Sequence, residues 1–151
     1  MKSLKLFIVA IFLLMALSSA QTIPQEMQMD WKTFSKNLVE SLKSEDQNIR
    51  QAAMQSIIQY SDYLKMEDGV PYLAFILCNG RDARERRMAM VALSKINTRR
   101  SMEYIYKGMM NENCCSTKEQ GRHILTKYCQ DNANVSVEDI RAAVWKYRSF
   151  L

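Results

Sequence analysis

Apolar residues recur at intervals of three or four along most of the chain, and this spacing constrains the fold more than any other feature. The first such series consists of Trp31, Phe34, Leu38 and Leu42. This spacing places the apolar side chains on one face of a helix. Similar series follow up to the C-terminus, and only 4 Gly and 2 Pro occur in 151 residues. Because helices tolerate Gly and Pro poorly, we expect an all-α fold of seven short helices with almost no strand.

The segment from Val70 to Cys78 is apolar at almost every position. Periodicity alone therefore also allows a buried strand here. Pro71 suits the first turn of a helix, and Gly80 suits a C-terminal cap. We favour a helix for this segment.

Three further helices differ in the strength of their signals. The segment 117–130 is weakened by Gly121, which costs about 1 kcal/mol relative to Ala inside a helix. Asp30 is a good N-cap for the first helix. The last helix follows Ser136, with Asp139 completing a box-like capping arrangement.

The chain repeats itself at a separation of 36 residues. The series Asp46, Arg50, Ala53 and Ile57 maps without a gap onto Asp82, Arg86, Ala89 and Leu93. A second shift reaches Arg122, where the arginine is kept, but Lys118 replaces the acid. The helices before these segments align in the same register. We therefore expect three helical hairpins and a closing helix.

The strings SEDQNIRQAAMQSI (44–57) and GRDARERRMAMVAL (80–93) resemble the second helices of HEAT-like repeats. The resemblance implies a short α-solenoid in which an acid and an arginine hydrogen-bond between adjacent repeats. The ladder residues that it implies are Asp46, Arg50, Asp82 and Arg86. Glu85 stands where the family prefers an aliphatic side chain. Short arrays of this kind are similar to armadillo-type stacks and to the repeats of phycobilin lyases.

The N-terminus has the order of a secretory signal peptide. Lys2 and Lys5 precede an apolar run from Leu6 to Leu17, and small residues follow up to Ala20. This run of 12 residues is shorter than the roughly 20 that a membrane-spanning helix needs. We expect cleavage after Ala20 and an exported protein, periplasmic or extracellular, with an uncleaved anchor as the alternative.

These features predict three parts: a signal peptide over residues 1–20, a short flexible segment over 21–29, and one helical domain over 30–151. Two of the 21 basic residues would leave with the signal, so the mature chain would carry a charge of +3 against 16 acidic residues. This mild charge does not suggest a nucleic-acid partner. No later segment is long and apolar enough to suggest membrane association after cleavage.

Four cysteines allow three complete disulfide pairings. Cys115 and Cys129 bracket one predicted helix and would lie about 20 Å apart, beyond the roughly 7 Å that a disulfide permits between Cα atoms. Cys78 and Cys114 share a column of the repeat, where packed helices lie about 8–10 Å apart. We expect a bond from Cys78 to Cys114 or Cys115, made at a loop that can shift. Cys129 falls in a core column and is expected to be a buried reduced thiol.

Two other groups could bind ligands. Arg81, Arg84 and Arg87 cluster at the start of one helix and form a candidate anion patch. Interleaved acids make a solvated, partly paired face the simpler interpretation. His123 lies among the cysteines of the third repeat, which allows a zinc site as an alternative, although the spacing matches no paired-cysteine motif.

These residues indicate no catalytic group, cofactor or metal. A short solenoid leaves a concave surface for binding. We therefore expect a non-enzymatic module that binds a protein or peptide partner. Two alternatives stay open: a thiol- or metal-dependent protein using the cysteine-rich third repeat, and a lyase-like accessory protein.

Overall fold

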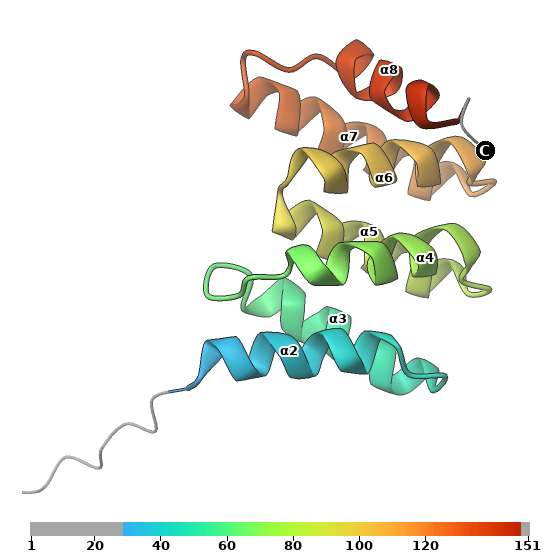
Figure 1. Ribbon diagram of the computed structural model, residues 1–151. Helices are drawn as coiled ribbons and strands as arrows, with labels where there is room; N and C mark the ends of the chain where they lie inside the picture. Colours follow the sequence, from blue (N-terminus) through green and yellow to red (C-terminus); the bar gives the residue numbers. More distant parts are fainter. Residues whose placement is uncertain (1–28, 149–151) are drawn as a thin grey trace, which may run out of the picture.

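The computed structural model describes residues 29–148, and that part of the chain is entirely helical, without a strand (Figure 1). The α-helices are α2 (Trp31–Leu42), α3 (Gln47–Gln59), α4 (Val70–Asn79), α5 (Ala83–Ile96), α6 (Arg99–Asn111), α7 (Cys115–Asp131) and α8 (Val137–Arg148), and a short 3₁₀ helix, η1 (Glu67–Gly69), precedes α4. The all-α prediction is therefore confirmed. The expected signal peptide lies outside the described residues. None of the described helices combines the length and the apolar character needed to cross a membrane.

Consecutive helices form hairpins that stack in chain order. The hairpins are α2–α3, α4–α5 and α6–α7, and α8 packs on α6. In Figure 1, α2, α4, α6 and α8 lie in one row, with α3, α5 and α7 in a second row behind them. Each hairpin therefore contacts mainly its neighbours along the chain.

One continuous apolar core lies between the two rows of helices. Its fully buried large side chains include Met54, Ile57, Leu73, Met90, Leu93, Met102, Ile105, Leu125 and Ile140. These residues belong to six different helices, so every hairpin contributes to the same core. Burial of one such side chain stabilises the fold by about 1.5–3 kcal/mol.

Short polar side chains begin the helices where the sequence predicts. Asp30 Oδ1 accepts the backbone N–H groups of Lys32 and Thr33, each at 3.1 Å. At α8, the Asp139 N–H donates to Ser136 Oγ at 3.1 Å, and the Ser136 N–H donates to Asp139 Oδ2 at 2.9 Å. These bonds satisfy amides that a helix leaves free in its first turn. Both predicted caps are confirmed.

The apolar segment from Val70 to Cys78 is helical, because it forms most of α4. Pro71 lies in the first turn, where a missing N–H costs nothing, and Gly80 is the C-cap. Helices α5 and α6 pack closely against its buried side, and α2 makes a smaller contact. The prediction of a helix here is confirmed, and the strand alternative is excluded.

Helix α7 is longer than the predicted segment 117–130, despite Gly121 in its middle. Gly121 is buried, and a Cβ atom there would lie 3.2 Å from Met109 Cβ of α6. The glycine therefore lets α6 and α7 approach closely. Relative to the preceding hairpin shifted by 36 residues, α7 begins four residues early, at Cys115, and α6 begins seven residues early, at Arg99.

Candidate binding groove

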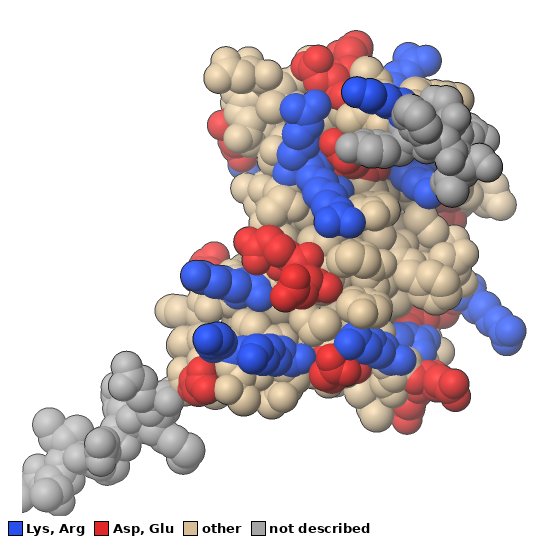
Figure 2. Space-filling model, in the orientation of Figure 1, with Lys and Arg blue, Asp and Glu red and all other residues tan. Residues whose placement is uncertain are grey.

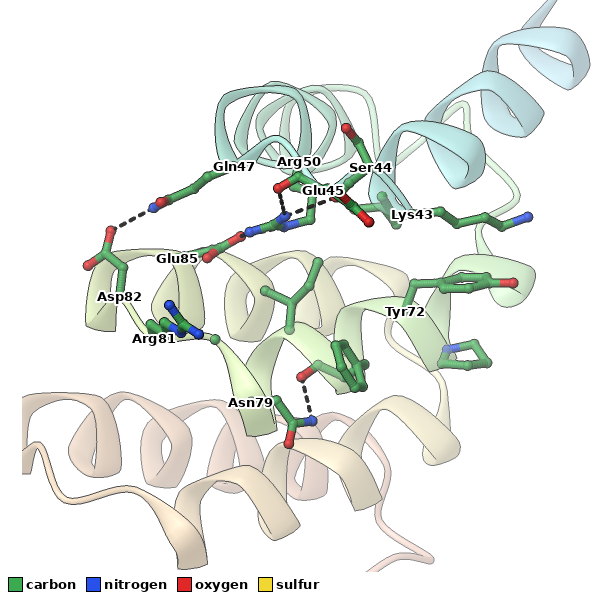
Figure 3. A pocket seen from close by; sticks show the side chains of 15 residues that line it. Lys43, Ser44, Glu45, Gln47, Arg50, Tyr72, Asn79, Arg81, Asp82 and Glu85 are labelled. Carbon is green, nitrogen blue, oxygen red and sulfur yellow. Dashed lines mark hydrogen bonds and ion pairs between the residues drawn. The ribbon is translucent and has the colours of Figure 1, made fainter.

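A groove of about 870 Å³ lies between the α2–α3 turn, the outer side of α4 and the α4–α5 turn (Figure 3). It exists because α2 touches α4 much less than α4 touches α6. Its lining residues are Leu42, Lys43, Ser44, Glu45, Gln47, Arg50, Pro71, Tyr72, Phe75, Ile76, Asn79, Gly80, Arg81, Asp82 and Glu85. The groove thus has an apolar side on α4 and a polar side on the two turns.

The apolar side exposes aromatic rings that the core does not need. In α4 the core takes Leu73, Ile76 and Leu77. Tyr72 and Phe75 are three residues apart and face outward, and Phe75 keeps 68% of its surface exposed. Lys43 Nζ lies 5.1 Å from the centre of the Tyr72 ring, a cation–π contact that orients this edge of the groove. An exposed phenylalanine within a groove is an unused apolar contact site.

Arg50 holds the polar side of the groove in place. Its Nε atom donates to Glu85 Oε1 at 2.7 Å. Its Nη1 atom donates to the carbonyl oxygens of Ser44 at 2.9 Å and Glu45 at 2.8 Å. Glu85 is only 2% exposed, so this pair lies in a low-dielectric environment where hydrogen bonds are strong. The α2–α3 turn is thereby tied to α5 (Figure 3).

Arg86 makes the same arrangement one hairpin later. Its Nη1 atom donates to the carbonyl oxygens of Gly80 at 2.9 Å and Arg81 at 3.2 Å. Its Nε and Nη2 atoms donate to the two carboxylate oxygens of Glu112 at 2.7 and 2.9 Å. Glu112 Oε1 also accepts the backbone N–H groups of the next two residues, each at 3.0 Å. The bonds from Arg86, followed by these amides, lower the pKa of Glu112 to about 2.

The expected ladder residues are placed only partly as the resemblance implied. Arg50 and Arg86 do connect adjacent hairpins, but the acids that they bind are not Asp46 and Asp82. Both aspartates are N-caps, of α3 and α5. Asp82 makes a separate link, because Gln47 Nε2 of the preceding hairpin donates to its Oδ2 atom at 3.1 Å. Both aspartates therefore cap helices and do not bind the arginines.

Sequence reasoning missed both acids that do bind the arginines. The position of Glu85 could have been recognised from the sequence, because it is a charged residue within an apolar stripe. A charge buried at such a position requires a partner of opposite charge. The sequence contained no comparable indication for Glu112, because it is the C-cap of α6 and lies outside every apolar series. The two acids therefore come from different structural positions, although the two arginines are equivalent.

The three arginines of the candidate anion patch are exposed. Arg84 and Arg87 lie on α5, and Arg81 precedes this helix and lines the groove. No ion pair involves their side chains within residues 29–148. On the face shown in Figure 2, basic and acidic side chains are interspersed without one dominant sign. The groove accordingly has one unpaired cation, Arg81, at its polar edge.

All four cysteines are free thiols in the structure. The expected bond from Cys78 to Cys114 or Cys115 is absent. Cys78 is partly buried at the end of α4, and the Cys114 sulfur lies 3.1 Å from Ser116 Oγ in its own turn. Cys129 was expected to be a buried thiol, but it is only partly buried and packs against the edge of the core.

The zinc alternative finds no support in the described residues. His123 is exposed and pairs with Glu119 one turn away, at 3.3 Å. Cys114 and Cys129 lie at opposite ends of α7. Across residues 29–148, no three His, Cys, Asp or Glu side chains gather in a way that could hold a metal ion.

Comparisons of this chain with protein-family models, with curated proteins and with solved structures gave no match. The residues of the groove combine an exposed aromatic pair, a rigid hydrogen-bonded wall and an unpaired arginine.

Proposed function

We propose that this chain is a short HEAT-like α-solenoid that binds a peptide segment of a partner protein in the groove beside α4. The exposed Phe75 ring carries this proposal. Placing so much aromatic surface in water is unfavourable by about 25 cal/mol per Å², and a bound apolar side chain would remove that cost. Tyr72, next to it on the same face, widens the contact site.

The solenoid part of the proposal is supported by the equivalence of two arginines. Arg50 binds the carbonyl groups six and five residues before it and a buried glutamate of the next hairpin. Arg86 makes the same set of contacts one hairpin later. Helices α3 and α5, which carry them, begin 36 residues apart, at Gln47 and Ala83. Repeated contacts at a repeated spacing are typical of stacked helical repeats.

The chemistry of the groove selects the kind of peptide. The aromatic side suits a large apolar side chain, which gains most when it is buried against another ring. Arg81 lies exposed at the polar edge and can bind a carboxylate of the peptide. The wall formed by Arg50 and Glu85 is already satisfied, so it contributes shape and rigidity. We therefore propose a segment with an apolar anchor and a nearby acidic residue.

A displayed library of random peptides selected on the immobilised full chain tests this function. We expect enrichment of peptides with an aromatic or large aliphatic residue near Asp or Glu. Phe75→Ala should weaken their binding about tenfold, because truncating a buried aromatic anchor costs on the order of 1–2 kcal/mol. Binding is measured by titration of a labelled peptide.

Met110→Ala is the matched control for this experiment. Met110 is a large exposed apolar residue on α6 that does not line the groove. Its truncation should leave peptide affinity unchanged. Enriched peptides that bind the Phe75→Ala chain as tightly as the parent would contradict the proposal, as would a library that yields no enrichment.

We also propose that the protein acts outside the cytoplasm, because residues 1–20 have the order of a cleavable signal. The expected result is a secreted chain whose N-terminal residue is Gln21. Intact-mass measurement of the protein recovered from the exporting host checks this. A membrane-bound product that retains residues 1–20 would contradict it.

A further inference from the structure

The turn between α6 and α7 presents a cysteine at the start of a long helix. Cys114 is the N-cap of the 17-residue α7 and is partly exposed. The first backbone N–H groups of a helix have no partner within the helix and carry a partial positive charge. The Cys114 sulfur makes no conventional capping hydrogen bond, but the partial positive charge of these nearby amides favours its anionic form.

Two hydroxyl groups add to these donors. Ser116 Oγ lies 3.1 Å from the Cys114 sulfur. The Thr117 hydroxyl is 0% exposed and has no conventional hydrogen-bond partner in the structure. A buried hydroxyl is rarely left without a partner. The Ser116 and Thr117 side chains, followed by their backbone amides, lower the pKa of Cys114 to about 6. The Thr117 hydroxyl is therefore close enough to stabilise the sulfur anion, and no other group in the described residues takes its hydrogen bond.

The charges around the sulfur do not oppose its ionisation. The titratable and charged groups nearby are Glu112 in the preceding turn, Arg86 of α5 and the neighbouring thiol of Cys115. The Glu112 carboxylate is paired with Arg86 through two hydrogen bonds. The negative charge closest to Cys114 along the chain is therefore already balanced.

A small cavity opens beside this turn. It measures about 230 Å³ and is lined by Asn113 and Glu112, the two residues before Cys114, together with Cys78, Gly108 and others. A cavity of this size can take a group as large as an amino acid. It is too small for a folded partner. The cavity lies at the turn that carries Cys114, although Cys114 itself does not line it.

We propose that Cys114 is a reactive thiol that exchanges with the disulfide of a low-molecular-weight thiol and carries the product as a reversible mixed disulfide. The Cys114 thiolate attacks one sulfur of R–S–S–R. The Cys114–S–S–R bond forms, the original S–S bond breaks, and R–S⁻ leaves and takes a proton from water. The Cys114 sulfur is oxidised and the departing sulfur is reduced, so the exchange needs no other oxidant. The proposal is independent of the peptide groove, which lies on other elements.

The pH dependence of adduct formation with oxidised glutathione tests this proposal. The reduced full chain is reacted from pH 5 to pH 10, and the adduct on each cysteine is quantified by peptide mass analysis. We expect adduct on Cys114 first, with a rate that rises with a midpoint near pH 6. The same chain unfolded in denaturant should show a midpoint near 8.5, the ordinary value for cysteine.

The expected rate advantage at pH 6 is about tenfold over the unfolded chain. At that pH a thiol of pKa 6 is about 150 times more ionised than one of pKa 8.5. Its lower basicity reduces the nucleophilicity of its anion by roughly 15-fold. A midpoint above pH 8, or first adducts on Cys78, Cys115 or Cys129, would overturn the proposal.

Three variants separate reactivity from structure. Cys114→Ser should abolish the fast reaction, and Cys115→Ser should leave it unchanged. Thr117→Val should raise the midpoint without lowering the free energy of unfolding, because the hydroxyl that it removes is buried without a conventional partner. A Thr117→Val chain with its midpoint still near pH 6 would overturn the role assigned to that hydroxyl.

Discussion

Glu112→Ala should lower the free energy of unfolding by about 3–5 kcal/mol, because it leaves a partly buried charge without its partner. Glu112 is 5% exposed and accepts two hydrogen bonds from Arg86 and two from backbone amides. The substitution removes all four bonds at once. Urea unfolding at pH 7, followed by circular dichroism, measures the loss. Glu85→Ala should show a smaller loss, because Glu85 holds Arg50 through Oε1 alone and accepts no backbone amide.

The same carboxylate should make the fold sensitive to acid. The pKa of Glu112 is lowered in the folded chain from its usual value near 4.5 to about 2, first by the bonds from Arg86. Between pH 4.5 and pH 2, this carboxyl group is protonated in the unfolded chain but not in the folded chain. The stabilisation, about 3 kcal/mol, is therefore complete above pH 4.5 and is lost as the pH falls towards 2.

Glu119→Ala is the control for both measurements, because Glu119 pairs with Arg122 on the exposed side of α7. An exposed pair of this kind contributes at most about 1 kcal/mol. The Glu119→Ala chain should keep the acid sensitivity of the parent, and the Glu112→Ala chain should lose a large part of it. Equal acid sensitivity in the parent and the Glu112→Ala chain would contradict the assigned role of this carboxylate.

Gly108→Ala should destabilise the fold by about 2 kcal/mol, although alanine is the better helix former by about 1 kcal/mol. A Cβ atom at this position would lie 2.6 Å from both Cγ and Cδ2 of Leu77. Leu77 is 2% exposed and packed within the core, so its side chain cannot move away without disturbing its neighbours. Helices α4 and α6 would have to separate. Thermal and urea unfolding of the variant measure the effect.

Gly121→Ala is the matched comparison for this close approach. The added Cβ atom would lie 3.2 Å from Met109 Cβ and 3.3 Å from its sulfur. Met109 lies at the edge of the core, so its sulfur can turn away, and the contact with its Cβ atom needs a shift of only a few tenths of an ångström. The variant should stay within about 0.5 kcal/mol of the parent. An equal loss of unfolding free energy in the two variants would show that α4 and α6 are packed no more closely than α6 and α7.

These predictions separate what stabilises the stack from what binds. The arginine–glutamate pairs and Gly108 set the spacing of the hairpins, so their substitution should reduce stability first. Phe75 is exposed and contributes little to the core, so Phe75→Ala should reduce peptide affinity and leave unfolding nearly unchanged. A variant set that reversed this pattern would identify the groove as a structural feature.

Much of the local structure was predictable from the sequence because its signals act over three or four residues. The caps at Asp30 and Ser136 bond amides within their own first turn, and the apolar spacing follows from 3.6 residues per helical turn. The role of Arg50 and Arg86 as links between hairpins was implied by the resemblance of their segments to HEAT-like repeats. The sequence by itself therefore determined an all-helical fold and which arginines join its parts.

Only the tertiary structure decided which groups those arginines bind and where a ligand could lie. Glu85 is 35 residues from Arg50, and Glu112 is 26 residues from Arg86. Such pairs depend on how whole hairpins stack, and a shift of one helical turn would replace every partner. The groove beside Phe75 exists only because α2 stands away from α4. Local periodicity carries no information about the distance between two helices, which the packing of many side chains sets together.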